Sequence, residues 1–276
     1  AAIRAFADKV RKFIPDLYIA GPDMNTTEKE MAAFADQIGN KMATTGKPAS
    51  MGGLPHELGS TGYGVALCTR VAVEFQGKRL DGMTVAIEGF GNVGTFAMKF
   101  LSGWGAKIVA VSDSRGVIYD ENGLDYGALM KTKAERGTVT AHGSGKVLPP
   151  AELFKLPVDI LIPGARPNVI TDANVGEVKA KIVSEAANIP MTYEVEKKLM
   201  ARGVLVLPDF LANAGGVISS YCETMGWDEK KMFEVVTEKI TNNTKLVMGR
   251  TKDNDTRAAA LEIAKERVRK AMAKRG

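Results

Sequence analysis

The sequence predicts an α/β protein built on a Rossmann-like, doubly wound and mostly parallel sheet, with flanking helices at both ends. Three observations favour this class. Short apolar runs alternate with helical patterns through the middle of the chain. A glycine-rich turn, GFGNVG, joins the first such run to a helix, and an acidic residue ends the next run. Together these features are typical of a dinucleotide-binding fold.

The central elements follow in the order that such a sheet requires. MTVAIEGF and KIVAVSD are predicted as strands on either side of a helix over 92–104, which makes a βαβ unit. Further apolar runs at 159–165, 181–188 and 204–210 are separated by helical patterns of suitable length. Strands that alternate with helices in this way predict parallel pairing.

Residues 1–15 carry the apolar stripe of an amphipathic helix. Its members lie three or four positions apart: Ile3, Phe6, Val10, and Phe13 or Ile14. Such a stripe must pack against another surface. The helix starts without a preceding segment and the chain has no initial Met, so we expect a natural N-terminal portion to be missing.

A strand-like run over 16–20 leads to a helix predicted over 27–40. Asn25 or Thr26 is its expected N-cap, and the acidic residues of its first turn complement its positive end. The segment from 45 to 64 is rich in glycine, which predicts a surface loop before a helix over 64–75. After Asn213 the pattern is helical, with a start at Gly215–Gly216 and further helices over 229–247 and 255–274.

Composition indicates a well-cored soluble protein of the cell interior. Apolar residues make up 45% of the 276 residues, no run approaches the ~20 residues of a bilayer span, and the start lacks a signal-peptide core. We therefore expect a cytoplasmic protein without a membrane partner. Cys68 and Cys222 are expected to be reduced and packed, and His56 and His142 have no partner at ligand spacing, so we assign no metal.

The net charge of +5 and the isoelectric point near 9.0 raise the alternative of nucleic-acid binding. Basic and acidic residues alternate through most helices, however, and the excess is concentrated in the last one. We interpret the excess as a solvated face that also attracts an anionic cofactor, and we expect no nucleic-acid partner. Salt-sensitive affinity for DNA is what the alternative predicts.

The GFGNVG turn is interpreted as the loop that binds the cofactor's pyrophosphate. Its first glycine permits a tight turn, its second lets the backbone approach the anion, and its third allows close packing of helix on strand. The N–H groups at the helix start then point toward the phosphates. A glycine-rich turn without a ligand is the alternative. The loop consists of Gly89, Phe90, Gly91, Asn92, Val93 and Gly94.

Asp113 lies at the end of the second strand, roughly 20 residues beyond the loop, where a carboxylate binds the adenine-side ribose. This position slightly favours NAD. Ser114 and Arg115 follow directly and could hold a 2′-phosphate, so NADP or dual use stays open. Asp113 is alternatively a turn residue after a strand.

Seven motifs follow one another along the chain: GPDMNT, TGKP, STGYGV, GFGNVG, SDS, EAAN and LPDFLANAGGV. In this order they resemble the glutamate dehydrogenase family. Leucine and phenylalanine dehydrogenases share the architecture, but PDFLANAGGV and TGKP are more similar to the glutamate branch. The resemblance implies reversible NAD(P)-dependent oxidative deamination of L-glutamate to 2-oxoglutarate and ammonia, and a homo-oligomer in the full-length form.

The resemblance also implies roles for individual residues. Asp23 of GPDMNT matches the catalytic acid/base, which exchanges a proton with the substrate nitrogen. Thr45 and Ser220 match hydroxyls that contact the substrate, Ser220 the one that reaches the γ-carboxylate. Without the resemblance, Asp23 is about as readily an Asx turn. Contacts around the nicotinamide and its ribose are implied for Thr61, Asn188, Asn213 and Gly216, of which Thr61 is alternatively a helix N-cap and Asn188 a turn residue.

By the same resemblance, 1–62 is the remnant of a substrate domain with a hinge and glycine-rich loop, 63–225 is the NAD(P)-binding domain, and 226–276 forms helices that pack back toward the substrate domain. The family's substrate-binding lysines come from sequence upstream of GPDMNT, and Lys47 is interpreted as a loop charge instead. We expect the chain to supply mainly the cofactor-binding portion and to bind cofactor without appreciable turnover on its own. The alternative is a non-catalytic NAD(P)-binding module.

Overall fold

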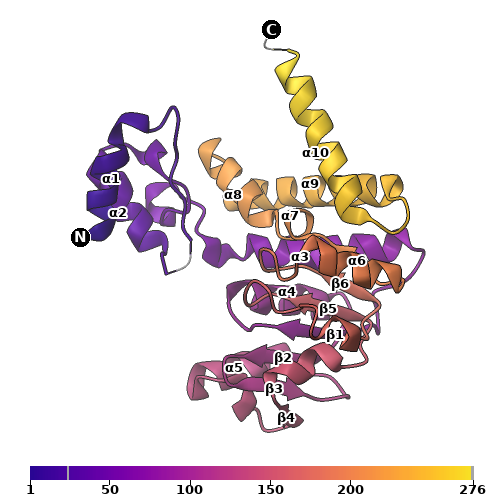
Figure 1. The fold of residues 1–276 in the computed structure, drawn as a ribbon. Helices are drawn as coiled ribbons and strands as arrows, with labels where there is room; N and C mark the ends of the chain where they lie inside the picture. The colour runs from indigo at the N-terminus through magenta and orange to yellow at the C-terminus, as the bar shows by residue number, and fades with distance from the viewer. Residues whose placement is uncertain (24, 275–276) are drawn as a thin grey trace. The chain divides into compact units, whose positions relative to one another are not determined.

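The computed structural model describes residues 1–23 and 25–274 (Figure 1). Contacts between residues divide the chain into two compact units. The first unit consists of Ala1–Ser60 and Gly215–Glu238, and the second consists of Thr61–Ala214 and the chain from Lys239 onward. Neither unit is therefore a single stretch of sequence.

A seven-stranded sheet with the order β4-β3-β2-β1-β5-β6-β7 forms the centre of the second unit (Figure 1). The predicted parallel strands are all present, and β1 lies between β2 and β5. The prediction of a mostly parallel, doubly wound sheet is confirmed. The strands are β1 (Thr84–Glu88), β2 (Lys107–Asp113), β3 (Gly116–Tyr119), β4 (Lys146–Leu148), β5 (Ile160–Pro163), β6 (Ile182–Ser184) and β7 (Leu205–Leu207).

Two strands at one edge of the sheet are missing from the sequence prediction. β3 pairs antiparallel with β2, and β4 pairs antiparallel with β3. β3 is four residues long and β4 is three residues long and largely exposed. Neither strand has the length or the alternation that a sequence pattern can detect.

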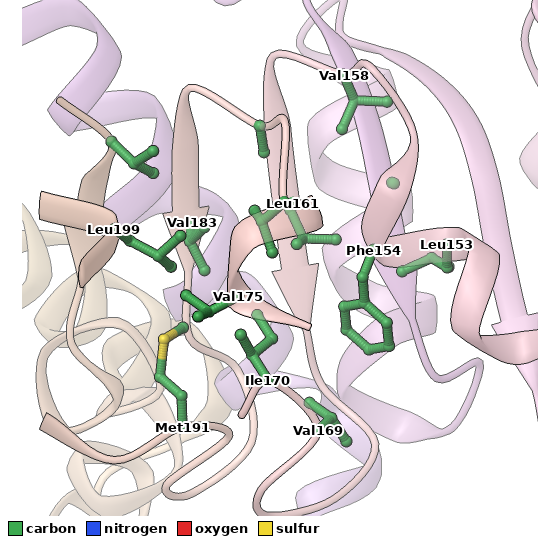
Figure 2. Packing of buried hydrophobic residues seen from close by; sticks show 14 of the residues in the cluster. Leu153, Phe154, Val158, Leu161, Val169, Ile170, Val175, Val183, Met191 and Leu199 are labelled. Carbon is green, nitrogen blue, oxygen red and sulfur yellow. The ribbon is translucent and has the colours of Figure 1, made fainter. Parts of the chain in front are cut away.

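A large apolar cluster packs against the parallel strands (Figure 2). Leu161 of β5 and Val183 of β6 contribute to it from the sheet, and Leu153, Phe154 and Leu199 contribute from the segments that connect the strands. Every residue of β5, β6 and β7 is buried. These strands therefore appear in the sequence as continuous apolar runs, and each buried Leu or Val contributes about 1.5–3 kcal/mol.

Local signals fix the helix ends in the second unit. The carboxylate of Asp125 accepts a hydrogen bond from the N–H of Ala128 at 2.7 Å, and Gly137 ends the same helix with φ 74°. Thr61 lies inside the first turn of its helix, so its interpretation as the N-cap is wrong. The helices are α3 (Ser60–Phe75), α4 (Asn92–Gly103), α5 (Tyr126–Arg136), α6 (Tyr193–Ala201), α7 (Asp209–Ala212) and α10 (Thr256–Met272), while α9 (Glu229–Arg250) has residues in both units.

The first unit is helical. Ile3, Val10 and Ile14 pack against a small core that includes Ala7 and Phe34, as the stripe predicts. Phe6 and Phe13, the other members of the stripe, are 44% and 40% exposed. The α-helices are α1 (Ala2–Val10), α2 (Glu28–Ile38) and α8 (Gly215–Thr224), and short 3-10 turns cover Arg11–Phe13, Lys41–Ala43, Ala49–Met51 and His56–Leu58.

Two local predictions for this unit are wrong. The N-cap of α2 is Thr27 rather than Asn25 or Thr26, because Thr27 forms a reciprocal capping box with Glu30. The run over 16–20 forms no strand; Ala20 alone of these residues pairs, in an isolated bridge with Thr44.

Within residues 1–23 and 25–274, no helix is long and apolar enough to cross a membrane. The same part of the chain contains no group of three or more His, Cys, Asp or Glu side chains placed to hold a metal ion. Cys68 and Cys222 are both buried, and burial raises the pKa of the Cys68 thiol to about 12.

Candidate dinucleotide-binding site

The glycine-rich turn links β1 to α4, as the sequence predicts. Gly89 adopts φ 93°, a conformation that L side chains rarely adopt. A Cβ on Gly94 would lie 1.8 Å from the carbonyl oxygen of Gly89, so only glycine allows the helix to approach the strand this closely. A Cβ on Gly91 would meet nothing within 4 Å, and this exposed residue is the N-cap of α4 without a side-chain cap. The turn thus leaves room for an anion at the helix start.

Two further residues, which no sequence motif predicts, support the turn. Gly62 of α3 packs against the start of α4, where a Cβ would lie 2.5 Å from the carbonyl oxygen of Val93. Glu88 ends β1, and its Oε2 accepts hydrogen bonds from the N–H groups of Gly164 at 3.1 Å and Ala165 at 3.0 Å. Burial raises the pKa of Glu88, although these hydrogen bonds oppose the rise. A glutamate that ends an otherwise apolar strand is the signal that could have found it.

Asp113 ends β2, but its carboxylate is occupied by donors from its own chain. Oδ2 accepts from Lys133 Nζ at 2.6 Å and from the N–H of Val139 at 2.8 Å. Oδ1 accepts from the N–H of Arg115 at 2.9 Å and from Thr138 Oγ1 at 3.1 Å. Burial alone would raise the pKa of Asp113, but the hydrogen bonds, led by Lys133, outweigh it and hold this pKa below its usual value. Ser114 and Arg115, in contrast, are exposed.

Asn188 and Asn213 lie together in the structure. Asn188 follows β6, and Asn213 ends the short helix α7 that follows β7. Asn213 Nδ2 donates to Asn188 Oδ1 at 2.7 Å and to the carbonyl oxygen of Ala186 at 3.3 Å. The pairing joins the EAAN and LPDFLAN segments into one local structure.

These groups share one edge of the sheet. β1, β2, β6 and β7 run parallel, so their carboxyl ends lie on the same side. Along that edge the strand order places Asp113 first, the glycine-rich turn next, and the Asn188–Asn213 pair last, with β5 between the turn and the pair. In doubly wound sheets, ligands bind outside the carboxyl ends where the strand order switches, which here falls between β1 and β5.

The residues implied for the substrate belong to the first unit. Asp23 is exposed, and its N–H donates to Thr26 Oγ1 at 2.7 Å. Thr45 is buried, and its N–H donates to the carbonyl oxygen of Ala20 at 2.8 Å. A Cβ on Gly46 would lie 2.7 Å from the ring of Pro22. The TGKP and GPD segments are therefore in direct contact.

Lys47 of TGKP is a buried ion-pair partner, so its interpretation as a loop charge is wrong. Its ammonium contacts Glu223 of α8 and the carbonyl oxygen of Thr44, and its side chain is 6% exposed. Glu223 also accepts hydrogen bonds from the N–H groups of Gly46 at 2.8 Å and Leu54 at 2.7 Å. These contacts connect TGKP to the helix that carries Gly216 and Ser220.

The fold and this edge of the sheet define a dinucleotide-binding α/β protein. A family model for Glutamate/Leucine/Phenylalanine/Valine dehydrogenase matches residues 52–276, and the chain belongs to this family.

Several similar proteins are named glutamate dehydrogenase. The chain is 46% identical over 279 residues to glutamate dehydrogenase of Aeropyrum pernix, covering 95% of this chain and 67% of the relative. It is 36% identical over 288 residues to an NAD-specific glutamate dehydrogenase of Staphylococcus aureus, covering 99% and 69%. The crystal structure of a hetero-hexameric glutamate dehydrogenase from Thermus thermophilus matches with TM-score 0.90 at 28% identity, covering 99% of this chain and 68% of that one. The chain thus spans about two thirds of each.

Proposed function

We propose that the second unit binds NAD or NADP along the carboxyl edge of its sheet, and that the chain serves the reversible oxidative deamination of L-glutamate to 2-oxoglutarate and ammonia. The order of groups along this edge carries the proposal. The β2 end would hold the adenosine, the glycine-rich turn the pyrophosphate, and the Asn188–Asn213 pair the nicotinamide end. The observed turn fits this cofactor, because the space beside Gly91 is empty and Gly94 lets the N-terminus of α4 pack closely against the turn.

The adenosine end accepts both cofactors in this proposal. The two oxygens of the Asp113 carboxylate already accept four hydrogen bonds, about as many as a carboxylate can accept. The sequence argument for NAD, which requires this carboxylate to bind the ribose, is therefore weaker. Lys133 balances its charge, so a 2′-phosphate would meet less repulsion there than beside an unpaired carboxylate. Ser114 and Arg115 are exposed beside it and supply donors suited to phosphate.

Glutamate is proposed as the substrate because the relatives are named glutamate dehydrogenases. Thr45 and Ser220 would contact it through their hydroxyl groups, and Thr61 and Gly216 would lie near the nicotinamide. The protein is proposed to form a homo-oligomer.

With the nicotinamide end held beside the Asn188–Asn213 pair, the cofactor would supply hydride-acceptor chemistry for Cα of glutamate. The chain's own contribution is proton transfer and orientation. The Asp23 carboxylate would take a proton from the substrate nitrogen as the Cα–H bond breaks, and return it in the reverse reaction. The Asn188–Asn213 pair would orient the nicotinamide.

Calorimetric titration of the purified chain with NAD and NADP, followed by a glutamate-dependent absorbance assay for the reduced cofactor, tests the proposal. Binding with turnover supports both parts of it. Binding without turnover supports the cofactor site and favours a non-catalytic module for this chain. Absence of binding to either cofactor contradicts the proposal.

A further inference from the structure

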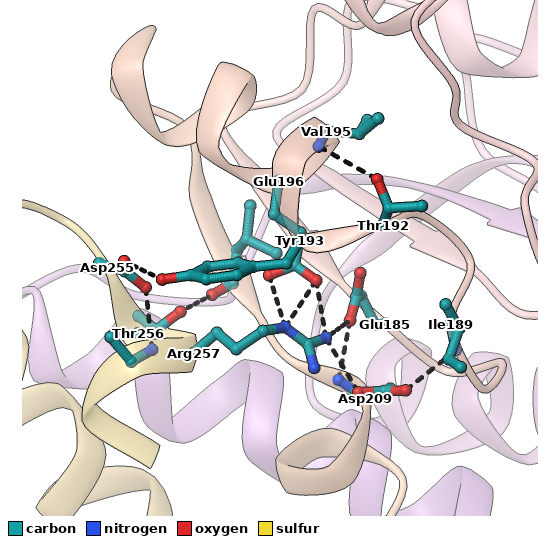
Figure 3. Close-up of polar contacts among 12 residues, drawn as sticks. Glu185, Ile189, Thr192, Tyr193, Val195, Glu196, Asp209, Asp255, Thr256 and Arg257 are labelled. Atoms are coloured by element: carbon teal, nitrogen blue, oxygen red, sulfur yellow. Dashed lines mark hydrogen bonds and ion pairs between the residues drawn. The ribbon is translucent and has the colours of Figure 1, made fainter. Parts of the chain in front are cut away.

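Arg257 of α10 pairs with three carboxylates that come from three other segments (Figure 3). Its Nε donates to both oxygens of Glu196 on α6 at 2.7 and 2.8 Å. Its Nη2 contacts Glu185 Oε2, just after β6, at 2.9 Å and Asp209 Oδ1, at the start of α7, at 3.0 Å. One planar guanidinium thus joins α10, α6, α7 and the loop after β6, a geometry that an ammonium group cannot reproduce.

This cluster is buried. The side chain of Arg257 is 14% exposed, while those of Glu185 and Glu196 are 0% exposed. Oε1 of Glu185 has no hydrogen-bond partner among the described residues. Replacing a buried ion-pair cluster with packed apolar residues is often neutral or stabilising, so stability alone is weak grounds for such an arrangement. The position of the cluster, next to the carboxyl ends of β6 and β7, offers a better reason for it.

The carboxylates that contact Arg257 also hold the backbone of the two loops at the end of the sheet. Glu185 Oε2 accepts from the N–H of Asp209 at 2.8 Å, which joins the β6 end to the β7 end. Asp209 Oδ2 accepts from the N–H of Ile189 at 2.9 Å, and Ile189 adopts φ 51°, a conformation that a β-branched residue adopts only under constraint.

Asn188 and Asn213 lie within these same loops. Asn188 directly precedes Ile189, and the N–H of Asn213 donates to the carbonyl oxygen of Asp209 at 2.8 Å. Arg257 therefore contacts the Asp209 carboxylate, which also holds the N–H of Ile189 next to Asn188. The backbone carbonyl of Asp209 holds the N–H of Asn213, and the two asparagine side chains are hydrogen-bonded to each other; these hydrogen bonds measure between 2.7 and 3.0 Å. Movement of the Asp209 carboxylate would shift the Ile189 backbone and the adjoining Asn188, whose side chain is hydrogen-bonded to that of Asn213.

We propose that Arg257 is a positioning residue for the nicotinamide end of the cofactor, acting through Glu185 and Asp209 on the loops that carry Asn188 and Asn213. The inference rests on the proposed cofactor site. It assigns a role in binding to a residue of the C-terminal helix that lies outside every motif recognised in the sequence.

The test compares two ligands that differ only at the nicotinamide end. NAD and ADP-ribose share the adenosine and the pyrophosphate, but ADP-ribose lacks the nicotinamide. For the Arg257→Met variant we expect affinity for NAD to fall about tenfold, while affinity for ADP-ribose changes less than about twofold. If the wild-type chain prefers NADP, the matched pair is NADP and 2′-phospho-ADP-ribose. The control is Arg250→Met, which removes an exposed arginine paired with Glu266 and should leave both affinities unchanged.

The outcomes separate the two proposals. If the wild-type chain binds neither ligand, the proposed cofactor site fails. If it binds both equally, or if Arg257→Met weakens both to the same extent or neither, the positioning role is overturned. Should Arg257→Met not fold, Asp209→Asn supplies the same comparison, because the amide replaces one of the two oxygens that accept from Arg257 and Ile189 with an NH2 donor. The same selective loss for NAD is expected there, and equal affinities for wild type and variant would overturn the inference.

Discussion

Asp113 illustrates how the surroundings of a single residue decide its chemistry. The sequence places it correctly at the end of β2, yet four donors from its own chain occupy its carboxylate. Three of these donors belong to Lys133, Thr138 and Val139, which follow some 20–26 positions later in the sequence. A motif identifies the position of a residue, but not the partners that satisfy it.

The exposed Arg115 side chain should therefore distinguish the two cofactors. We expect Arg115→Ala to weaken NADP binding by about 1–2 kcal/mol, the worth of a charge-assisted hydrogen bond to phosphate, and to leave NAD binding nearly unchanged. Titration of both cofactors against the variant measures this, with Arg136→Ala as a control on the neighbouring helix α5. Equal weakening of NAD and NADP would show that Arg115 does not contact the 2′ position.

In the first unit, the Lys47–Glu223 ion pair is also decided by its surroundings, because both side chains are buried. Removing one partner leaves the other charge buried, so Lys47→Met should lower the free energy of unfolding by about 3 kcal/mol. Lys131→Met, which removes an exposed partner of Glu135, should cost less than about 0.5 kcal/mol. Urea unfolding measures both, and similar costs for the two variants would mean that the buried pair contributes little.

At the scale of elements, most of the fold could be predicted from the sequence and some of it could not. The parallel strands and their helices were predictable because continuous burial leaves long apolar runs and the glycine turn marks the first crossover. β3 and β4 are too short for that signal. The Thr27 cap was missed by a residue or two, a normal error for helix ends. The cluster around Arg257 could not be predicted from local sequence patterns, because the partners of Arg257 lie 48 to 72 positions away from it in the sequence.

Two glycines of α4 provide a matched pair for the strand–turn–helix element. Gly94→Ala would place a methyl group 1.8 Å from a backbone oxygen of the turn, so we expect a loss of several kcal/mol in stability or complete loss of cofactor binding. Gly103→Ala adds the same group where nothing lies within 4 Å, and should be neutral or stabilise by up to ~1 kcal/mol. Thermal unfolding and cofactor titration of both variants check this, and tolerance of alanine at 94 would refute the close packing.

For the molecule as a whole, the buried cluster makes stability depend on pH. Burial, followed by the neighbouring Glu196 carboxylate, raises the pKa of Glu185 to about 9 from 4.5. Between these values the folded protein keeps a proton that the unfolded chain has released, so the contribution of Glu185 to stability falls as pH rises. The charged and titratable neighbours are Glu196 and Tyr193 on α6, Asp209 on α7, Arg257 on α10, and Asp255 at the N-cap of α10.

Glu185→Gln cannot titrate, which isolates this contribution. The free energy of unfolding of the wild type relative to the variant should decrease by more than about 1 kcal/mol between pH 5 and pH 9. The pKa of the exposed Glu266 is lowered, chiefly by hydrogen bonding with Arg250, so this carboxylate does not titrate between pH 5 and pH 9. The difference in unfolding free energy between the wild type and Glu266→Gln should therefore stay constant over that range. A constant difference for Glu185→Gln would mean that Glu185 is ionised throughout.

The division of the first unit into two distant stretches has a consequence for synthesis. Residues 1–60 leave the ribosome long before α8, yet Lys47 is matched by Glu223, 176 positions later. Until that helix is synthesised, the ammonium lacks its carboxylate partner, and we expect the TGKP segment to stay solvated. The sheet of the second unit, complete through β7, can fold during this interval. Within residues 1–276, the stretch that is synthesised first is therefore completed later than the sheet, and a released chain that ends before residue 215 should contain a protected sheet and an N-terminal stretch that a protease cleaves readily.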